Sequence, residues 1–544
     1  MFCSVFSSFI LSTLANLSRS VYIIIDLIWA VNAHMLFNNG GTYMNRTVLS
    51  WMDKTIPRIP EKVLFTDAES QLTFGEFDAI SKAIGTYLAN HVSEGAPVVV
   101  MSGRNVRTPA VFAGAVRAGC FYAPIDATMP VSRLNQILGV IKSDIMLVDK
   151  QFESVARALS FDGKLVLIDE ILDTPVDAVL LARRSASLIP TSPLYVIFTS
   201  GSTGVPKGVI TSHESLMNYI DGFCDVMDMN ENDVLGNQSP LDYIAAIRDI
   251  YIPLKTGAST VIIPKTEFSM PKQLFETLNR HKVTTLCWSV AGVELPVKMG
   301  GFAEGKPEFV KKVCFSGSVM PCKYLKVWQE HLPDVLYVNQ YGPTEATASC
   351  TYYVVRDKVE DSTVLPIGKP YANYGVFLLN EDNTPTPYGE TGEICVKGPV
   401  LALGYYGDPV RTNEVFIQNP LNSNYRELIY KTGDLGSFNA DGDLEFHGRK
   451  DRQIKHMGHR IELGEIESTA SEIAGVDECC ALYHKEKELL YLFYTGVATS
   501  KAIVLHFRAV LPAFMVPRKL IQLDLLPRLP NGKLDMTTLK TYFK

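Results

Sequence analysis

The sequence lacks the features that mark several common functional classes. Its ten cysteines form no CxxC pair, so neither a structural zinc site nor a disulfide framework is expected, and a reducing cytoplasm is the simpler setting. Basic residues are not in excess: the formal net charge is −7, which argues against a general nucleic-acid binder. A nucleotide ligand is still compatible, because backbone N–H groups and one or two basic side chains suffice to bind phosphate.

The first 43 residues are apolar but contain no run of membrane-spanning length. Val5–Leu17 and Val21–Val31 are each shorter than the roughly 20 residues that a bilayer requires, and Asp26 interrupts the second run. No basic region precedes the first run, so a secretory signal is a poor fit. Membrane association is therefore not expected. Residues 1–43 are either a weakly membrane-associating extension or an over-extended start, with translation beginning near Met44.

The rest of the chain is long and apolar enough to form two or more domains. The whole sequence has 544 residues, of which 47% are hydrophobic and 20% are charged, so large cores can be buried. Helix-like periodicity alternates with short apolar runs from Val48 onward, which predicts α/β layers built on largely parallel sheets. The predicted helices are Phe77–Val92 and Thr108–Ala118. The predicted strands are Pro97–Met101, Ile145–Val148, Lys164–Ile168, Leu194–Phe198, Thr260–Ile263, Thr284–Trp288 and Val335–Val338.

The pattern changes after about Tyr352. Short strands separated by turn residues predict a β-rich lobe that completes the large domain. The charged, glycine-led stretch Gly448–Arg452 suits a linker, and a smaller α+β unit follows it. We therefore predict a large domain over 44–449 and a small, mobile C-terminal domain over 450–544.

One segment has the composition of a phosphate-binding loop. Leu194–Phe198 is apolar and leads into Thr199–Gly208, which is rich in hydroxyl groups and glycine and carries Lys207 near its end. Glycines allow close approach of the backbone to an anion, and hydroxyl and ammonium groups bind phosphate oxygens. The loop does not match GxxxxGK[ST], so it is not a Walker A motif. Taken alone, it is equally typical of a flexible surface loop.

The loop is one of a series of strings that occur in a fixed order. They are Leu72–Phe77, Arg117–Asp126, Thr199–Gly208, Asn339–Glu345, Gly392–Gly398, Tyr430–Asp434, Gly448–Glu467, Leu511–Pro517 and Asn531–Lys533. With them the sequence resembles the adenylate-forming superfamily of amino-acid-activating domains, carrier-protein ligases, acyl-CoA synthetases and luciferases. The resemblance covers roughly residues 45 to 544.

The resemblance implies an ATP site. It assigns the phosphate groups to Thr199, Ser200, Gly201, Ser202, Thr203, Gly204 and Lys207. It assigns the remaining nucleotide contacts to Gly317, Asn339, Tyr341, Gly342, Thr344, Asp434, Arg449 and Lys533. Among these, Tyr341 is expected against the adenine ring, Asn339 on its edge, and Asp434 on the ribose hydroxyls.

The resemblance also implies the catalytic residues. Lys533, Thr199 and Glu345 are expected to act on the reacting groups, with Glu345 as the ligand of a Mg²⁺ ion that bridges the ATP phosphates. Asp451 matches the hinge about which the small domain rotates between two half-reactions. In the first, Lys533 is expected to contact the substrate carboxylate. Read without the resemblance, Glu345 fits the first turn of a helix and Lys533 an exposed loop tip.

The acid substrate is predicted less directly. Asp242 is the candidate partner for a substrate α-ammonium group, although its spacing from Thr256–Ala258 is about two residues too long; a helix N-cap is the alternative. Arg248 either points into the pocket, where it would pair with an acidic or hydrogen-bonding side chain, or is a solvated helix residue. The expected side-chain pocket is polar and comprises Arg248, Ser289, Cys314, Ser316, Gln340, Ala348 and Ser349.

These observations predict an enzyme that converts a small or polar amino acid into an aminoacyl-adenylate and releases pyrophosphate. The acyl group would then pass to the phosphopantetheine thiol of a separate carrier protein, as in stand-alone adenylation domains and D-alanine–carrier protein ligases. The alternatives are an acyl-CoA synthetase and a catalytically silent adenylate-binding homologue.

Overall fold

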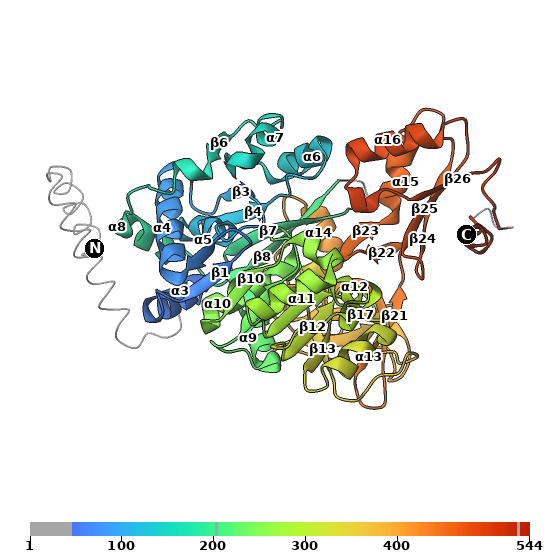
Figure 1. Ribbon diagram of the computed structural model, residues 1–544. Coiled ribbons are helices and arrows are strands. Elements are labelled where there is room, and N and C mark those ends of the chain that lie inside the picture. The colour runs from blue at the N-terminus through green and yellow to red at the C-terminus, as the bar shows by residue number, and fades with distance from the viewer. Residues whose placement is uncertain (1–45, 202–204, 530–533, 544) are drawn as a thin grey trace.

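The computed structural model describes residues 46–201, 205–529 and 534–543. The chain up to Arg449 forms a large body, and the chain from Gln453 forms a smaller body at its side (Figure 1). The predicted boundary at residues 449 and 450 therefore falls between β21 (Leu444–Arg449) and β22 (Gln453–His456). The predicted extension 1–43 lies outside the described residues.

Two large sheets with mostly parallel strands form the centre of the molecule. The first runs in the order β15 (Lys369–Pro370), β14 (Thr351–Val355), β13 (Leu336–Tyr341), β12 (Lys312–Ser316), β11 (Thr285–Ser289), β9 (Val234–Asn237), β10 (Ser259–Ile262), β1 (Val63–Thr66) and β2 (Gln71–Thr73). The second runs in the order β18 (Gly404–Tyr405), β8 (Lys207–Ser212), β7 (Pro193–Thr199), β4 (Phe121–Pro124), β3 (Pro97–Met101), β5 (Ile145–Val148) and β6 (Lys164–Leu167). The predicted α/β class with parallel-rich sheets is confirmed.

Helices cover these sheets, and their sequences explain their positions. The covering helices are α3 (Val48–Thr55), α4 (Phe74–His91), α5 (Thr108–Arg117), α6 (Val131–Ile141), α7 (Glu153–Arg157), α8 (Ala178–Ala186), α9 (His213–Met227), α10 (Ile247–Thr256), α11 (Pro271–Arg280), α12 (Val290–Lys298) and α13 (Cys322–His331). Helix α4 begins three residues before the predicted Phe77, because Thr73 and Glu76 form a capping box at its start. It packs closely on α5, where a Cβ on Gly114 would lie 2.6 Å from Ile84.

The predicted β-rich lobe is an antiparallel sheet. Its strands are β16 (Gly375–Leu379), β17 (Gly392–Lys397), β20 (Leu428–Phe438) and β19 (Phe416–Gln418), with β21 paired to β20; α14 (Pro409–Val415) lies beside it. The pairing of β20 with β21 sets Asp434 opposite Arg449 in register. Two residues that are 15 positions apart are thereby brought to the same end of the lobe.

The small body consists of a hairpin and a three-stranded sheet with helices. The hairpin is β22 with β23 (His459–Glu462), and the sheet is β24 (Cys479–His484), β25 (Leu489–Tyr494) and β26 (Lys519–Gln522). One sheet face packs on α15 (Leu463–Ser471) and α16 (Ser500–Val510), and the other on Leu526 and α17 (Met536–Lys540). In Figure 1 the hairpin lies at the junction of the two bodies.

A buried ion pair joins the two bodies at the base of this hairpin. Arg133 of α6 donates to Glu465 of α15 at 2.6 Å, and their side chains are 6% and 1% exposed. Burial raises the pKa of Glu465 to about 7, although Arg133 lowers it. Ser132 also donates to the backbone carbonyl of Ala509 at 3.0 Å. The docked position of the small body therefore depends on compensating a buried carboxylate.

No helix within residues 46–201, 205–529 and 534–543 is long and apolar enough to cross a membrane. The nine cysteines in these ranges are all free thiols.

Removing Arg133 is expected to release the small body. Arg133→Ala leaves Glu465 without its counter-charge, at an expected cost of about 3–5 kcal/mol of docking free energy. Arg133 lowers the pKa of Glu465, so without Arg133 that pKa rises above its value of about 7 and the docked variant takes up a proton at higher pH; the cost is therefore full in alkaline solution and declines as the pH falls towards 7. Trypsin cleavage at Lys450 and Arg452 in the linker measures the undocked population.

Two further variants test the cause. Glu465→Gln in the Arg133→Ala background removes the uncompensated charge and should restore most of the protection from trypsin. Lys150→Ala breaks an exposed ion pair with Glu153 on the large body and should leave cleavage unchanged. Equal cleavage of the wild type and Arg133→Ala at pH 8 would contradict the role of the pair.

Candidate active site

The predicted phosphate-binding segment connects two antiparallel strands. Thr199 ends β7, Lys207 begins β8, and the two residues face each other in register. Gly201 approaches the chain closely, since a Cβ there would lie 2.1 Å from the carbonyl oxygen of Val205. Ser200 donates to the backbone carbonyl of Arg460 at 2.7 Å. The predicted residues Ser202, Thr203 and Gly204 lie outside the described residues.

A buried carboxylate stands beside this hairpin. Glu345 lies in the 3-10 helix Thr344–Ala346 that follows β13, and it is fully buried. Lys207 approaches it at 3.2 Å and the Tyr405 hydroxyl donates to it at 2.7 Å. Nη1 of Arg460, on β23 of the small body, donates to both carboxylate oxygens at 3.0 and 2.8 Å. Three separate elements therefore converge on one carboxylate.

The charges of this cluster stabilise one another. Burial alone raises the pKa of Glu345, but Arg460 and Lys207 outweigh it and hold that pKa well below its ordinary value. Burial also lowers the pKa of Lys207 to about 8. Glu345 is therefore ionised, and any cation that binds it must replace or join the two that are already there.

A second cluster lies at the end of the β-rich lobe. Asp434 accepts from the Tyr341 hydroxyl and from Arg449, each at 2.5 Å. Arg449 also donates twice to Asp451 at 2.6 Å. The predicted hinge residue is thus tied to the predicted nucleotide residues. The side chain of Asn339 donates to the carbonyl of Pro366 at 2.7 Å.

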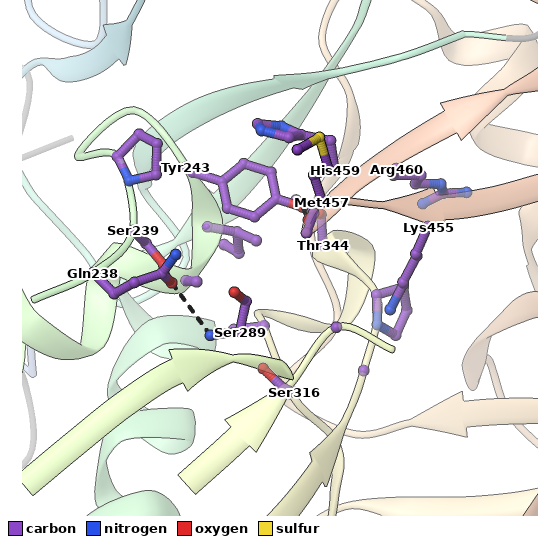
Figure 2. A pocket seen from close by; sticks show the side chains of 18 of the residues that line it. Gln238, Ser239, Tyr243, Ser289, Ser316, Thr344, Lys455, Met457, His459 and Arg460 are labelled. Carbon is purple, nitrogen blue, oxygen red and sulfur yellow. Dashed lines mark hydrogen bonds between the residues drawn. The ribbon is translucent and has the colours of Figure 1, made fainter. Parts of the chain in front are cut away.

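The two clusters border one cavity of about 90 Å³. Its lining includes nine of the predicted site residues: Arg248, Ser289, Ser316, Gly317, Gly342, Thr344, Ala348, Asp434 and Arg449. Ser289 and Ser316 lie at the ends of the neighbouring parallel strands β11 and β12 (Figure 2). This is the edge at which α/β sheets commonly bind ligands. Ala348 has a φ of 72°, a left-handed conformation that is uncommon for a residue with a side chain and recurs at functional sites.

The tip of the small body's hairpin fills part of this cavity. Met457, Gly458, His459 and Arg460 all line it, and the Tyr243 hydroxyl donates to the carbonyl of Gly458 at 2.7 Å. Figure 2 shows Tyr243 reaching across the cavity towards these residues. Small-molecule sites usually measure about 300–1,000 Å³. The described arrangement therefore leaves less room than a nucleotide and an acid need together.

The remaining predicted pocket residues form a buried layer behind the cavity. Gln340 accepts from Arg248 at 2.9 Å and from Ser349 at 3.5 Å. Cys314 lies 3.9 Å from the Arg248 guanidinium. Arg248 is buried, so its interpretation as a solvated helix residue is wrong.

Asp242 does not line the cavity. The lining residues at that point are Tyr243, Ile244 and Ala245, at the 3-10 helix Ile244–Ala246. Burial, with a contribution from Asp126, raises the pKa of Asp242 to about 7, while Arg104 and Lys265 lower it. Asp242 thus faces charges other than those of the pocket. It also caps no helix, since the 3-10 helix is preceded by Tyr243, which makes no side-chain cap.

Several residues of the site escaped the sequence analysis. Tyr405, Arg460 and Tyr243 each make a contact described above, yet none follows from local spacing. Arg460 lies within the family-matching string Gly448–Glu467, and that match is the feature of the sequence that could have indicated a role for it. Lys533 lies outside the described residues; its neighbour Leu534 packs with the cluster around Leu526 and Leu539, on the sheet face opposite α15.

Comparison with known proteins defines the family. Residues 52–406 match the model of the family "AMP-binding enzyme", so the chain belongs to that family. It is 32% identical over 514 residues to a linear gramicidin synthase protein of Brevibacillus parabrevis, covering 91% of this chain and 6% of that protein. It is 29% identical to tyrocidine synthase 1 of the same organism, covering 88% of this chain and 43% of that protein. The chain thus spans less than half the length of these relatives.

Solved structures share the fold at low identity. One is a nonribosomal peptide synthetase (NRPS) protein containing adenylation and PCP domains, with a TM-score of 0.79, 22% identity and coverage of 91% of this chain and 84% of that one. Another is the Vibrio cholerae adenylation domain AlmE in complex with glycyl-adenosine-5'-phosphate, with a TM-score of 0.79, 21% identity and coverage of 92% and 98%. The predicted adenylate-forming superfamily is therefore confirmed.

Replacing Arg460 is expected to withdraw the hairpin from the cavity. Arg460→Met removes two hydrogen bonds to a buried carboxylate, so amide hydrogen exchange in 453–462 should accelerate by about a hundredfold or more. Hydrogen–deuterium exchange mass spectrometry of the full chain measures this. Arg452→Met is the matched control, because Arg452 pairs with Glu467 inside the small body. Unchanged exchange of the hairpin in Arg460→Met would show that other contacts hold it.

Proposed function

We propose that the protein uses ATP to activate a carboxylic acid as an acyl-adenylate, releases pyrophosphate, and transfers the acyl group to the phosphopantetheine thiol of a carrier protein. The observation that carries this proposal is one cavity lined by Asp434, Arg449 and Arg460 of the small body's hairpin, where Arg460 in turn pairs with Glu345, the carboxylate that Lys207 also approaches. A carboxylate attacking the α-phosphorus builds up negative charge, and fixed cations and N–H groups at this position stabilise it.

Magnesium fits the site as an ion shared with the nucleotide. The described residues contain no group of three His, Cys, Asp or Glu side chains that would hold a metal alone. Glu345 offers carboxylate oxygens, the ligands that Mg²⁺ prefers, and the phosphates would supply others. Bound there, Mg²⁺ would neutralise phosphate charge. Because Arg460 donates to both oxygens of Glu345, it would give up or share these contacts when Glu345 ligates an ion.

The position of the small body's hairpin and the solved relatives support a carrier protein as the acceptor of the acyl group. The hairpin of the small body lines the cavity, and the resemblance to the adenylate-forming superfamily implies that the region from Gly458 to Glu467 flanks the face used in the second half-reaction. Adenylation domains fused to PCP domains are among the solved relatives, as is an o-succinylbenzoate CoA synthetase from Bacillus subtilis with a TM-score of 0.77. A carrier protein is the first choice, and coenzyme A is the acceptor to be compared with it. The predicted amino-acid substrate rested on Asp242, which does not line the cavity.

The proposal is tested by acid-dependent ATP–pyrophosphate exchange. The wild type should catalyse exchange with at least one carboxylic acid, and Glu345→Gln should lower the rate about a hundredfold or more. Glu294→Gln is the matched control, since Glu294 is also buried but pairs with Lys298 outside the cavity. Thioester formation is then compared for holo-carrier protein and coenzyme A. Absence of exchange with every acid in a broad panel, including D- and L-amino acids, would refute the activity.

Lys533 is expected to serve only the first half-reaction. Lys533→Ala removes the cation proposed to meet the substrate carboxylate, so adenylate formation should be lost. Transfer from a preformed acyl-adenylate should persist, because that step is proposed to use the hairpin face instead. Pyrophosphate exchange and single-turnover thioester formation measure the two steps, with Lys540→Ala as a surface control. Near-normal exchange by Lys533→Ala would contradict this role.

A further inference from the structure

The inner end of the cavity holds a buried cation without an anionic partner. Arg248, on α10, is 1% exposed and lines the cavity. Its Nε donates to the carbonyl of Ala245 at 3.3 Å, and its Nη1 donates to Gln340 Oε1 at 2.9 Å. The guanidinium also lies 5.9 Å from the centre of the Phe223 ring. Within the described part of the chain, none of these partners is a carboxylate and Nη2 makes no hydrogen bond.

The neighbouring acid compensates this charge only in part. Asp249 is buried beside Arg248, but its Oδ2 accepts from Asn237 at 2.7 Å and it makes no ion pair in the described residues. Burial raises the pKa of Asp249 to about 7, against the lowering effects of Asn237, Arg248 and Arg104. A buried guanidinium is costly unless an anion is bonded to it. The fork of Arg248 therefore has room for an anionic ligand.

A second donor stands next to it without a partner. Gln340 is 2% exposed, and its Nε2 is buried without a hydrogen-bond partner in the described structure. Its Oε1 already accepts from Arg248, so the free amide donor and the free Nη2 belong to one connected pair of side chains. Unsatisfied buried donors are rare and call for an explanation such as a missing ligand. Both donors suit the oxygens of a carboxylate.

The cavity has no matching place for a cation. Asp434 is its one acidic lining residue in the described chain, and Arg449 and Tyr341 already occupy both of its oxygens. Asp242 lies outside the lining, where Ile244 and Ala245 stand instead. A substrate ammonium group would thus meet apolar side chains and hydroxyl groups, whereas a substrate carboxylate would meet Arg248, with Gln340 bonded to Arg248 directly behind it.

We propose that the activated acid carries a second carboxylate, which Arg248 binds at the inner end of the cavity while Gln340 holds the guanidinium from behind. This inference rests on the proposed acid activation and names the substrate class: an acid with one carboxylate for the adenylate and another for recognition. Two kinds of compound share that chemistry, namely unsubstituted dicarboxylic acids and acidic amino acids.

The wild-type enzyme tests the proposal directly. ATP–pyrophosphate exchange is measured with pairs that differ only in the second group: succinate and succinamate, glutarate and glutaramate, L-aspartate and L-asparagine, L-glutamate and L-glutamine. The diacid of the preferred pair should exceed its amide in kcat/KM by about a hundredfold or more. Comparing kcat/KM for the two dicarboxylic acids with that for the two acidic amino acids shows whether the enzyme accepts an α-amino group.

Variants assign the preference to Arg248. Arg248→Gln should lower the ratio of diacid to amide about a hundredfold, and Arg248→Lys should recover part of it, since lysine keeps the charge but not the two-pronged geometry. Arg248→Glu should shift the preference towards acids that carry an ammonium group, such as β-alanine. Arg184→Gln is the matched control: Arg184 is half-buried, donates to the backbone carbonyl of Val92 at 2.9 Å and does not line the cavity.

The outcomes separate this inference from the activity on which it rests. Exchange with no acid at all would refute the activity. Exchange with neutral acids or neutral amino acids at rates equal to or above the diacids would refute the second-carboxylate site and leave the activity standing. An unchanged diacid-to-amide ratio in Arg248→Gln would do the same. Should that variant fold poorly in thermal unfolding, the wild-type pairs still decide.

Discussion

The buried carboxylate of Glu345 is the interaction on which the arrangement of the molecule depends. Taking a carboxylate out of water costs several kcal/mol unless cations and hydrogen-bond donors replace the solvent. Here the replacement comes from Lys207 on the phosphate hairpin, from Tyr405 and from Arg460. Because Arg460 belongs to the small body, the charge balance of the large body's site is complete only while the two are docked.

The sequence contains enough information to predict the fold and much of the candidate site. Lys207, Asp434 and Arg449 stand in short strings whose conformation is local, such as a hairpin or two paired strands, so their spacing specifies where they lie. Long-range pairings carry no such local signal. Arg460 and Glu345 are 115 residues apart, and Arg133 and Glu465 are 332 apart. Only the packing of the two bodies brings these charges together.

At the substrate end of the cavity, residue spacing in the sequence does not predict which side chains line the cavity. Asp242 follows β9 on an irregular turn before the 3-10 helix Ile244–Ala246, and side chains on such a turn have no fixed period. The spacing between Asp242 and Thr256–Ala258 is about two residues too long, and Tyr243, Ile244 and Ala245 line the cavity instead of Asp242. Arg248 lies inside the regular helix α10, where orientation depends on burial that spacing alone does not reveal.

The location of the ion pairs between the two bodies has a consequence for their response to salt. Dissolved ions weaken charge pairs in solvent, with a Debye length of about 8 Å at physiological ionic strength, but they act far less on pairs that solvent does not reach. Arg133–Glu465 and Arg460–Glu345 are of the second kind, whereas Lys298–Glu488, whose side chains are 33% and 50% exposed, and Lys450–Glu393 in the linker are of the first. Added salt should therefore weaken only the exposed pairs, and the two buried pairs leave docking dependent mainly on protons and bound ligands.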